Sequence, residues 1–558
     1  MRQAWLSDSR VHLGAVLGGY AALAAAVQVH CADLLSSDGE CYLRMAVWVA
    51  EGDIGRALFG HWSPLGPWLA SPLVALGMVP RYALRLWIGL WGGAAVVGVW
   101  RLAGRLGAGA WARAAAAGCG ALMIAEFSAQ HRVDLLLAAL LLFYLDAALD
   151  ERLGRSWPWA LGVGLLAGAA YLAKQYALPF FAVHFTALVL LRAWAERGEA
   201  GRWRRLARAW AVGLGGFALL AAPWAAALSA RYGRPTFGTA GATTYAIYGP
   251  WRDEPGRPQP RGLERPPADA PSVWQDASRD AASPPRTPSP LGSRAALERQ
   301  VRFAGRNAAL IVGHLARADE FRLGLVALAL APVAAVLARR RREAAFRYLA
   351  VLVTVVVFCG GYAFVFAEDA RFFWFPMLVL VALAFHFADL LPRAGARAWA
   401  ARPRRLLLAA VGAMAVISFG FHPVRFLAVL LRQPPPGREH RLVAERLDAL
   451  GVPGPLAAAG ERGWWNGLHT AYYLGAKYAG APRSEAPEVI ADEMRAAGAA
   501  TLLVWGRPRL AEALGARRAF RLVAWWGPGE VLGLRHSVAV LPLVEPSGRP
   551  PPAEEGEP

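Results

Sequence analysis

The sequence predicts an α-helical polytopic membrane protein, in which about eleven transmembrane helices precede a small C-terminal α/β domain. Of its 558 residues, 56% are hydrophobic and only 18% are charged, against roughly 25% charged in an average soluble domain. The apolar residues fall in blocks of roughly 16–22, separated by arginine clusters, which is the hydropathy pattern of repeated membrane spans. After Pro434, helical patterns alternate with short apolar strand patterns. This combination excludes a soluble globule, a disordered chain and a disulfide-framework protein.

The apolar blocks define the spans, and the arginines between them define the orientation. Arginine clusters fall on alternate connections, for example 192–205 and 339–347. The positive-inside rule places these connections and the N-terminus in the cytoplasm. The other connections and the C-terminal domain are then extracytoplasmic. The predicted spans are 11–30, 82–100, 111–127, 133–149, 158–173, 176–192, 208–229, 323–338, 348–366, 373–391 and 406–426, and the external connections are 31–81, 128–132, 174–175, 230–322 and 367–372.

Two apolar segments have alternative interpretations. Leu65–Val79 is short and contains Pro67 and Pro72, and a full span there would place the next arginine cluster outside. We therefore interpret it as an interfacial or re-entrant segment. Val11–Val27 has the length of a signal peptide, but Gln28–His30 lacks a small-x-small cleavage site, which favours an uncleaved anchor. Cleavage would change the number of spans but not the exposed side.

We divide the chain into a transmembrane domain (1–430), a soluble α/β domain (434–545) and a disordered tail (546–558). The middle of external loop 230–322, from Pro250 to Pro290, is rich in Pro, Arg, Asp and Ser, which predicts irregular structure. Its end, Ala295–Leu315, predicts an interfacial helix. In the α/β domain we expect helices at Glu439–Leu450 and Pro487–Ala497, and strands at Pro455–Ala459, Thr501–Trp505 and Phe520–Trp526.

Composition also limits the partners and cofactors. The formal net charge of +20 would suit a nucleic-acid binder, but much of it lies in cytoplasmic loops, where anionic membrane lipids balance it. We therefore expect no nucleic-acid partner. No Cys/His cluster has metal-ligand spacing, so we expect no cofactor, and a divalent cation is left open only at Asp38 and Glu40. Cys31 and Cys41 share one external loop, where a disulfide or two free thiols would fit an oxidising compartment.

Two polar motifs lie in the first external loop. Asp38 and Glu40 fall within one turn of a predicted interfacial helix, Cys41–Glu51, where an acid can accept a proton from an attacking hydroxyl or simply cap the helix. The second motif, His61-Trp62-Ser63-Pro64-Leu65, offers aromatic faces to a sugar or an isoprenoid chain. Its tryptophans would equally serve as anchors at the membrane interface.

Two further motifs place charges at the outer ends of spans. Asp134, preceded by His131 and Arg132, opens a span where an unpaired acid is costly. Lys174 is one of only two lysines among the 60 basic residues. Its compact ammonium acts as a point charge and suits a phosphate. A lysine at a span end can also snorkel toward the membrane surface. Glu368-Asp369-Ala370-Arg371 lies on the opposite flank, and Arg371 could supply a bidentate guanidinium.

The location of these charges separates three classes of function. A transporter would bury ionisable groups near the bilayer midplane and show inverted repeats with broken helices, and the sequence shows neither. A non-catalytic scaffold for envelope assembly would tolerate the loss of Asp38 or Lys174. The motifs instead gather at the outer interface, so we expect the chemistry to lie there.

The set of motifs resembles the GT-C superfamily of membrane glycosyltransferases, in the branch of lipid A aminoarabinose transferases and protein O-mannosyltransferases. The similar elements are Asp38-x-x-x-Tyr42, His61–Leu65, Arg85 before Gly93, Asp134, Tyr171–Lys174 and Glu368–Phe372 before Pro376. The resemblance covers roughly 1–200 and 350–545. Ser63, Gly39 and Gln175 depart from the residues usual in that branch, which are Lys, Glu and Gly.

The resemblance implies an inverting transferase that takes a hexose or pentose from a polyprenyl-phosphate carrier at the extracytoplasmic face of a bacterial inner membrane. It implies that Asp38 and Asp134 are catalytic, and that Lys174, Arg85 and Arg371 bind the donor phosphate. Since Ser63 replaces a lysine, phosphate binding shifts toward those three cations. A glycolipid, a polysaccharide or a protein is left open as the acceptor. Further substrate contacts are implied for Glu40, Tyr42, His61, Trp62 and Glu368.

Overall fold

The computed structural model describes residues 9–129, 132–253, 262–268, 270–275, 287–394, 401–531 and 533–544. The chain forms two compact units. The first, here the helical unit, comprises Met1–Ala32, Tyr42–Pro258 and Asp280–Gln433. The second, here the α/β unit, comprises Asp33–Cys41, Gln259–Arg279 and Pro434–Pro558. His131 and the predicted tail 546–558 lie outside the described residues, as does much of 250–290.

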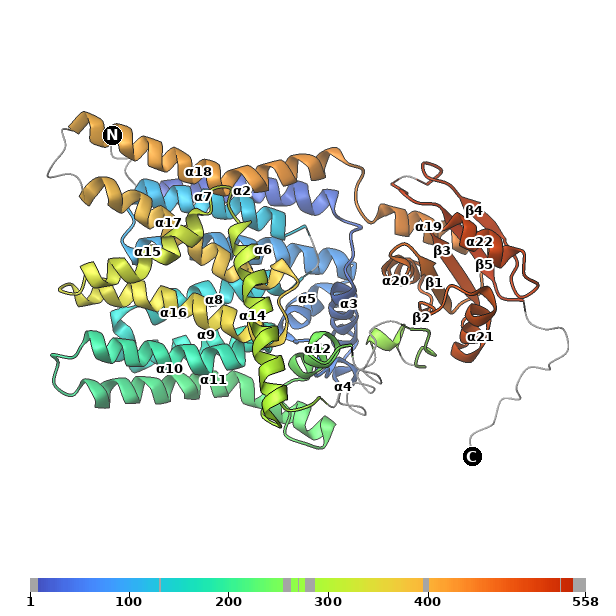
Figure 1. Cartoon of the computed structure of the whole chain (residues 1–558), viewed down its shortest axis with the longest axis horizontal. Helices are drawn as coiled ribbons and strands as arrows, with labels where there is room; N and C mark the ends of the chain where they lie inside the picture. The colour runs from blue at the N-terminus through green and yellow to red at the C-terminus, as the bar shows by residue number, and fades with distance from the viewer. Residues whose placement is uncertain are drawn as a thin grey trace. The chain divides into compact units, whose positions relative to one another are not determined.

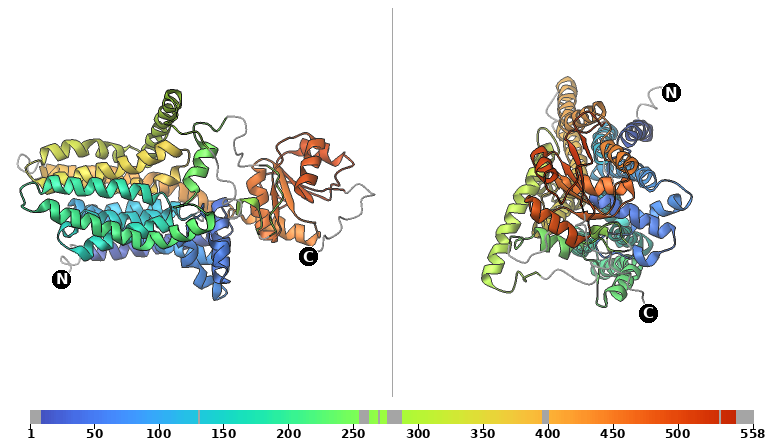
Figure 2. Two further views of the ribbon diagram at one scale, coloured as in Figure 1. Left: turned by 90° about the horizontal axis from the view of Figure 1, so that it is seen from below. Right: turned by 90° about the vertical axis from the view of Figure 1, so that its right-hand side faces the viewer.

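Long helices lie side by side in the helical unit (Figure 1, Figure 2). Each predicted span coincides with one of them: α2 (Ser9–His30), α6 (Pro80–Leu106), α7 (Ala110–Phe127), α8 (Asp134–Ala148), α9 (Trp157–Ala173), α10 (Ala177–Ala195), α11 (Arg202–Tyr232), α15 (Leu323–Leu337), α16 (Arg342–Val365), α17 (Trp374–Ala394) and α18 (Ala401–Arg432). Among the described residues, seven helical segments are long and apolar enough to cross a membrane, while α9 and α15 are shorter apolar helices. The predicted number of crossings therefore stays a prediction.

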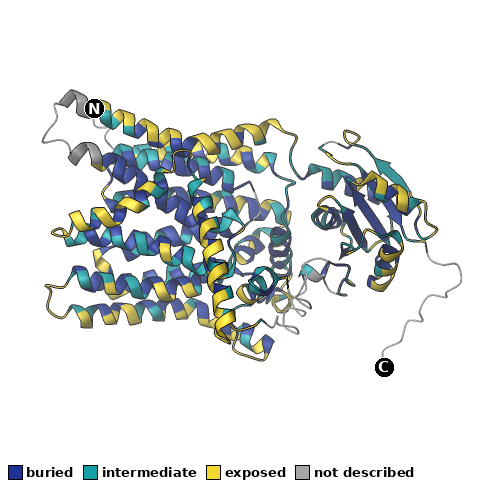
Figure 3. Ribbon diagram, in the orientation of Figure 1, coloured by how far each residue is buried: buried dark blue, intermediate teal, exposed yellow. Residues whose placement is uncertain are grey.

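The exposure of apolar side chains fits a bundle in lipid. Figure 3 shows exposed residues along α11 and α18, while α17 is buried along most of its length. Large apolar side chains, among them Leu219, Ile417 and Val424, are exposed. Continuous apolar exposure of this kind is typical of a surface that meets other apolar groups. Small residues bring α9 and α11 together, because a Cβ on Gly164 would lie 2.0 Å from the Gly213 carbonyl oxygen. Close backbone approach of this kind stabilises helix pairs in membranes.

Two arginines just beyond the predicted span 82–100 belong to its helix. Arg101 and Arg105 lie in the last turns of α6, which extends past the expected end at residue 100. Arg101 Nη2 lies 2.6 Å from Asp146 Oδ2, and Arg105 Nε lies 3.0 Å from Asp146 Oδ1. A second carboxylate, Asp150 Oδ2, lies 2.8 Å from Arg105 Nη1, so Asp146 and Asp150 together balance both guanidinium groups beyond the apolar block.

Shorter helices surround one end of the bundle. These are α3 (Ser37–Ala50), α4 (Ile54–Ala57), α5 (Leu65–Ala75), α12 (Ala240–Tyr248) and α14 (Arg294–Ala316). The predicted helix Ala295–Leu315 is α14, which runs across the long helices (Figure 1). Its Gln300 and Asn307 amides donate to the carbonyls of Phe364 and Ala363, each at 3.0 Å. Carbonyls in the last turn of a helix have no further helical amide to accept from. The two bonds from α14 give such carbonyls of α16 a donor.

The α/β unit contains a five-stranded sheet in the order β2-β1-β3-β5-β4. The strands are β1 (Leu456–Gly460), β2 (Tyr478–Gly480), β3 (Thr501–Trp505), β4 (Ala524–Trp526) and β5 (Val538–Pro542), and the helices are α19 (Arg438–Ala449), α20 (Gly463–Leu474), α21 (Pro487–Ala497) and α22 (Pro508–Gly515). β1 pairs in parallel with β2 and β3, and β5 runs antiparallel to β3 and β4. Alternate residues of β3 enter two apolar cores, with Leu502 in one and Leu503 in the other. Burial on both faces requires helices on both sides.

The long loop after α12 adds to the α/β unit. Leu263 and Ser272, from the long loop after α12, form isolated bridges with Gly480 and Tyr478 on β2. The loop thus covers a sheet edge that would otherwise present unpaired backbone groups.

Of the predicted strands, Phe520–Trp526 is shorter in the structure, because regular pairing with β5 begins only at Ala524. The fold class predicted from the sequence, a polytopic helical bundle with a small C-terminal α/β domain, is confirmed.

Candidate functional site

A buried ion pair joins two neighbouring helix ends. Asp134 is the first residue of α8 and is 5% exposed. Lys174 is the C-cap of α9, where the chain becomes extended. The Lys174 ammonium pairs with Asp134 Oδ1, and it also lies 4.1 Å from the centre of the Phe372 ring. The pairing explains how a carboxylate is tolerated at this depth, since removing a lone charge from water is costly.

Two arginines extend this pair into a larger charge cluster. Arg132 Nη1 and Arg371 Nε lie 3.1 and 3.0 Å from Asp369 Oδ2. Asp369 caps the short 3-10 helix η3 (Ala370–Phe373) by accepting from the backbone amide of Arg371. Lys174, Arg371 and Arg132 all lie close enough to Asp134 for their charges to act on its carboxylate. We call Arg132, Asp134, Lys174, Asp369 and Arg371 the ion cluster; its three cations outnumber its two carboxylates.

An unpartnered hydroxyl lies beside the ion cluster. Tyr362, near the end of α16, stacks on Phe372 with ring centres 5.1 Å apart. Its hydroxyl is buried and has no hydrogen-bond partner among the described residues. The charges of Asp134 and Arg371 both act on this side chain. Such a buried group normally finds a partner, so it marks a place where a ligand oxygen would complete the site. Tyr362 was not predicted, because it lies inside an apolar span with no motif around it.

The aromatic loop motif lies at the same end of the helical unit. The rings of Trp62 and Tyr42 pack edge to face with centres 5.5 Å apart, and His61 packs on Trp62 at 4.4 Å. The preceding Gly60 carbonyl accepts from the side-chain amide of Gln175, the residue after Lys174. At the start of α5, a Cβ on Gly66 would lie 2.8 Å from Val133, next to Asp134. Three of the predicted motifs therefore meet at one end of the bundle.

Arg85 and Glu368 have other neighbours. Arg85 is buried on α6, and its Nη1 donates to Gln28 Oε1 at 2.9 Å. Glu368 Oε1 lies 3.0 Å from Arg252 Nη1 and 3.5 Å from Arg306 Nη2. These two arginines come from the loop after α12 and from α14. Neither was predicted, because the sequence around them carries no motif.

Asp38 and Glu40 belong to the α/β unit, although they open α3. Glu40 is 1% exposed, and its carboxylate pairs with Nδ1 of His469 on α20. Burial raises the pKa of Glu40, and the neighbouring His469 opposes that rise. Two residues before Glu40, Asp38 shares the first turn of α3. The pair with His469 therefore holds the turn that carries Asp38.

The structure also shows the state of the cysteines and of the possible metal ligands. Cys31, Cys41, Cys119 and Cys359 are free thiols. Among the described residues, no group of three or more His, Cys, Asp or Glu side chains is placed to hold a metal ion. The divalent cation left open at Asp38 and Glu40 stays a prediction.

A histidine beside this turn makes the α/β unit acid-sensitive. Burial, and then the charge of His469, lowers the pKa of His440 from 6.5 to about 3. Between these values the unfolded chain binds a proton that the folded unit does not, so stability is lost as the pH falls from 6.5 toward 3. We expect hydrogen exchange of the α19 amides to accelerate over this range. His440→Gln, which can still donate to Asn466 Oδ1 but does not titrate, should weaken the pH dependence; an unchanged profile would contradict this assignment.

The architecture is a polytopic helical bundle that carries an α/β unit and an ion cluster at helix ends. The sequence matches no family model and no curated protein. Among solved structures, it is similar to ArnT from Cupriavidus metallidurans in the apo state, at 16% identity and a TM-score of 0.54, covering 93% of this chain and 96% of that one. The same protein bound to undecaprenyl phosphate matches at 16% identity and a TM-score of 0.54, covering 93% and 97%. The fold of this chain is thus shared with ArnT, as the resemblance of the motifs leads us to expect.

Proposed function

We propose that this protein is a membrane glycosyltransferase that moves a sugar from a polyprenyl-phosphate carrier to an acceptor at the extracytoplasmic face. The observation that carries the proposal is the ion cluster, in which Lys174, Arg132 and Arg371 outnumber Asp134 and Asp369. This cationic surplus lies beside the unpartnered Tyr362 hydroxyl. An anionic phosphate would balance the charge and give that hydroxyl an acceptor.

The proposed reaction is a single displacement. The acceptor hydroxyl attacks the anomeric carbon of the donor sugar, and Asp38 accepts the hydroxyl proton. The bond between that carbon and the phosphate oxygen breaks, and the polyprenyl phosphate leaves with the electron pair. Lys174 and Arg371 stabilise the charge that grows on the leaving oxygen. Arg85 donates to Gln28 and lies outside the ion cluster as defined, so its role as a phosphate ligand rests on the resemblance alone. Attack from the opposite side inverts the sugar carbon.

The remaining predicted residues take supporting roles in this proposal. Asp134 holds the Lys174 ammonium in place and lies near the sugar or acceptor. Trp62 and Tyr42 offer an aromatic surface, while His61 and Glu368 contribute polar contacts to the substrates. Glu40, which is paired with His469, maintains the turn that carries Asp38. Undecaprenyl phosphate in the ArnT structure supports a polyprenyl phosphate as the carrier.

A ligand-binding experiment tests the donor site. We expect the purified protein in nanodiscs to bind undecaprenyl phosphate, and Arg371→Gln to weaken binding about tenfold, the typical loss for one charge-assisted hydrogen bond. Arg302→Gln, an exposed arginine on α14, is the matched control and should bind normally. Equal binding by Arg371→Gln would remove this arginine from the donor site.

A second measurement separates the three classes of function. With a sugar-linked undecaprenyl phosphate in the membrane, a transferase releases undecaprenyl phosphate and a glycosylated acceptor. A transporter moves the intact lipid to the other leaflet, and a scaffold does neither. Release without flipping is the result that we expect; flipping without release would overturn the proposal.

A further inference from the structure

A cavity of about 350 Å³ lies at the other end of α9 from Lys174. One wall is formed by residues 153–157, just before and at the start of α9. The other lies at the start of α11 and is formed by Gly201, Arg204, Arg205, Arg208 and Ala209. At 1.5 Å per residue, the length of α9 separates the cavity from Lys174 by about 25 Å. The cavity is therefore distinct from the ion cluster and lies at the opposite, predicted cytoplasmic, end of the bundle.

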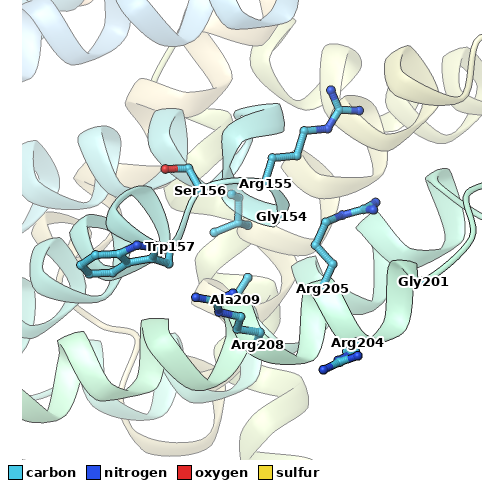
Figure 4. A pocket seen from close by; sticks show the side chains of 10 residues that line it. Gly154, Arg155, Ser156, Trp157, Gly201, Arg204, Arg205, Arg208 and Ala209 are labelled. Carbon is cyan, nitrogen blue, oxygen red and sulfur yellow. The ribbon is translucent and has the colours of Figure 1, made fainter.

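Four arginines line this cavity: Arg155, Arg204, Arg205 and Arg208 (Figure 4). Two of them are neutralised by acids outside the lining. Arg205 Nη2 lies 2.6 Å from Glu196 Oε2 and 2.7 Å from Glu199 Oε2, and Arg155 Nη2 lies 3.6 Å from Glu199 Oε1. Arg155 also approaches Glu151 at 4.0 Å.

The other two arginines are available for an anion. No ion pair among the described residues includes Arg204 or Arg208, and both side chains are exposed. They are four residues apart on α11, so they project from the same side of the helix.

Backbone donors add to the positive potential of the cavity. Ser156 is the N-cap of α9, but its side chain makes no capping hydrogen bond. The second residue of α9, Pro158, has no N–H, so the first-turn amides without a partner within the helix are those of Trp157 and Trp159. The helix dipole makes this end attractive to anions. Ser156 and Trp157 both line the cavity, so these donors add to the field of Arg204 and Arg208.

Exposed indole rings indicate a lipid rather than a soluble anion. Trp157 on the cavity wall is 56% exposed, and Trp203 on α11 is 55% exposed. Exposed tryptophans at the ends of apolar helices are typical of the headgroup layer of a membrane. Farther along α11, Leu219 is exposed, so the same helix offers an apolar surface to acyl chains.

We propose that this cavity binds the phosphate group of an anionic phospholipid. Arg204 and Arg208 bind the phosphate oxygens, the Trp157 and Trp159 amides add donors, and the Trp157 ring packs against the glycerol region. The bound lipid bridges the starts of α9 and α11, the pair of helices that pack through glycines. The site adds to the proposed transferase activity and does not depend on it.

The test uses the full-length protein in nanodiscs of phosphatidylcholine with a minor fraction of phosphatidylglycerol. Native mass spectrometry measures how strongly each lipid is retained. We expect the wild type to retain phosphatidylglycerol preferentially, and the double variant Arg204→Gln/Arg208→Gln to lose about thirtyfold of that preference, from the usual contribution of two arginines near a lipid surface. The matched control is Arg339→Gln/Arg340→Gln, which removes the same charge from another predicted cytoplasmic connection and should retain the lipid.

Three results would overturn the proposal. Equal losses in both double variants would indicate nonspecific attraction by net charge, and no loss in either would show that the cavity binds no lipid. Competition by millimolar inorganic phosphate would identify a soluble anion as the occupant. An unchanged thermal unfolding midpoint of Arg204→Gln/Arg208→Gln in phosphatidylcholine alone shows that the variant is folded, and Arg208→Lys, which keeps the charge, should retain part of the preference.

Discussion

Replacing Lys174 with methionine is expected to destabilise the helical unit by about 3–5 kcal/mol, the usual cost of removing one partner from a buried ion pair. The reason is the carboxylate that remains. Asp134 is 5% exposed, and after the substitution it keeps only the charges of Arg371 and Arg132, which are also paired with Asp369. The free energy of unfolding in mixed micelles measures the loss.

The only other lysine provides a matched control. Lys477 Nζ donates to the carbonyls of Pro267 and Ala268 at 2.8 and 3.0 Å, so Lys477→Met leaves no buried carboxylate behind. It should cost about 1 kcal/mol, the net value of ordinary hydrogen bonds. The double variant Lys174→Met/Asp134→Asn should recover much of the lost stability, because it removes the uncompensated charge. Equal costs for the two lysine variants would contradict this account of the ion cluster.

Asp38→Asn is expected to lower sugar transfer by about 10²–10⁴-fold, the usual contribution of a general base. An asparagine amide cannot accept the acceptor proton, while Glu40 and His469 still hold the first turn of α3. The measurement is release of undecaprenyl phosphate from its sugar-linked form in membranes. Binding of undecaprenyl phosphate itself should be unchanged.

A neighbouring acid controls for structural effects in that segment. Asp33 lies in the same stretch of the α/β unit, and its Oδ2 is 3.2 Å from Nε of Arg441. Asp33→Asn removes one acid without touching the proposed base, so transfer should stay near the wild-type rate. Undiminished transfer by Asp38→Asn, at normal membrane levels, would exclude the base role.

Much of the helical unit could be predicted because the information is local. Each apolar block is long enough to form a helix by itself. In the α/β unit, α21 and β3 likewise begin and end where the sequence predicts. The predictions missed β5 and α20. β5 is a short run of buried residues without alternation, and α20 contains glycines and aromatic residues rather than strong helix formers.

The candidate site could be predicted only in part. Lys174 stands out in the sequence because it is one of two lysines among 60 basic residues, and Asp134 stands out because it opens an apolar block. Their pairing, across 40 residues, was not predicted. Neither was the pair of Glu40 with His469, across 429 residues. Tyr362, Arg252 and Arg306 lie in surroundings that carry no motif.

The amino-acid sequence by itself determined which segments are helices, how apolar each one is, and which rare ionic residues stand at their ends. Those properties depend on neighbours within a few turns, where periodicity and hydropathy act. Only the tertiary structure decided which acid neutralises which cation, and that α9 carries the ion cluster at one end and an arginine-lined cavity at the other. The physical reason is that pairing between charges depends on distance in space, and packing of distant helices sets that distance.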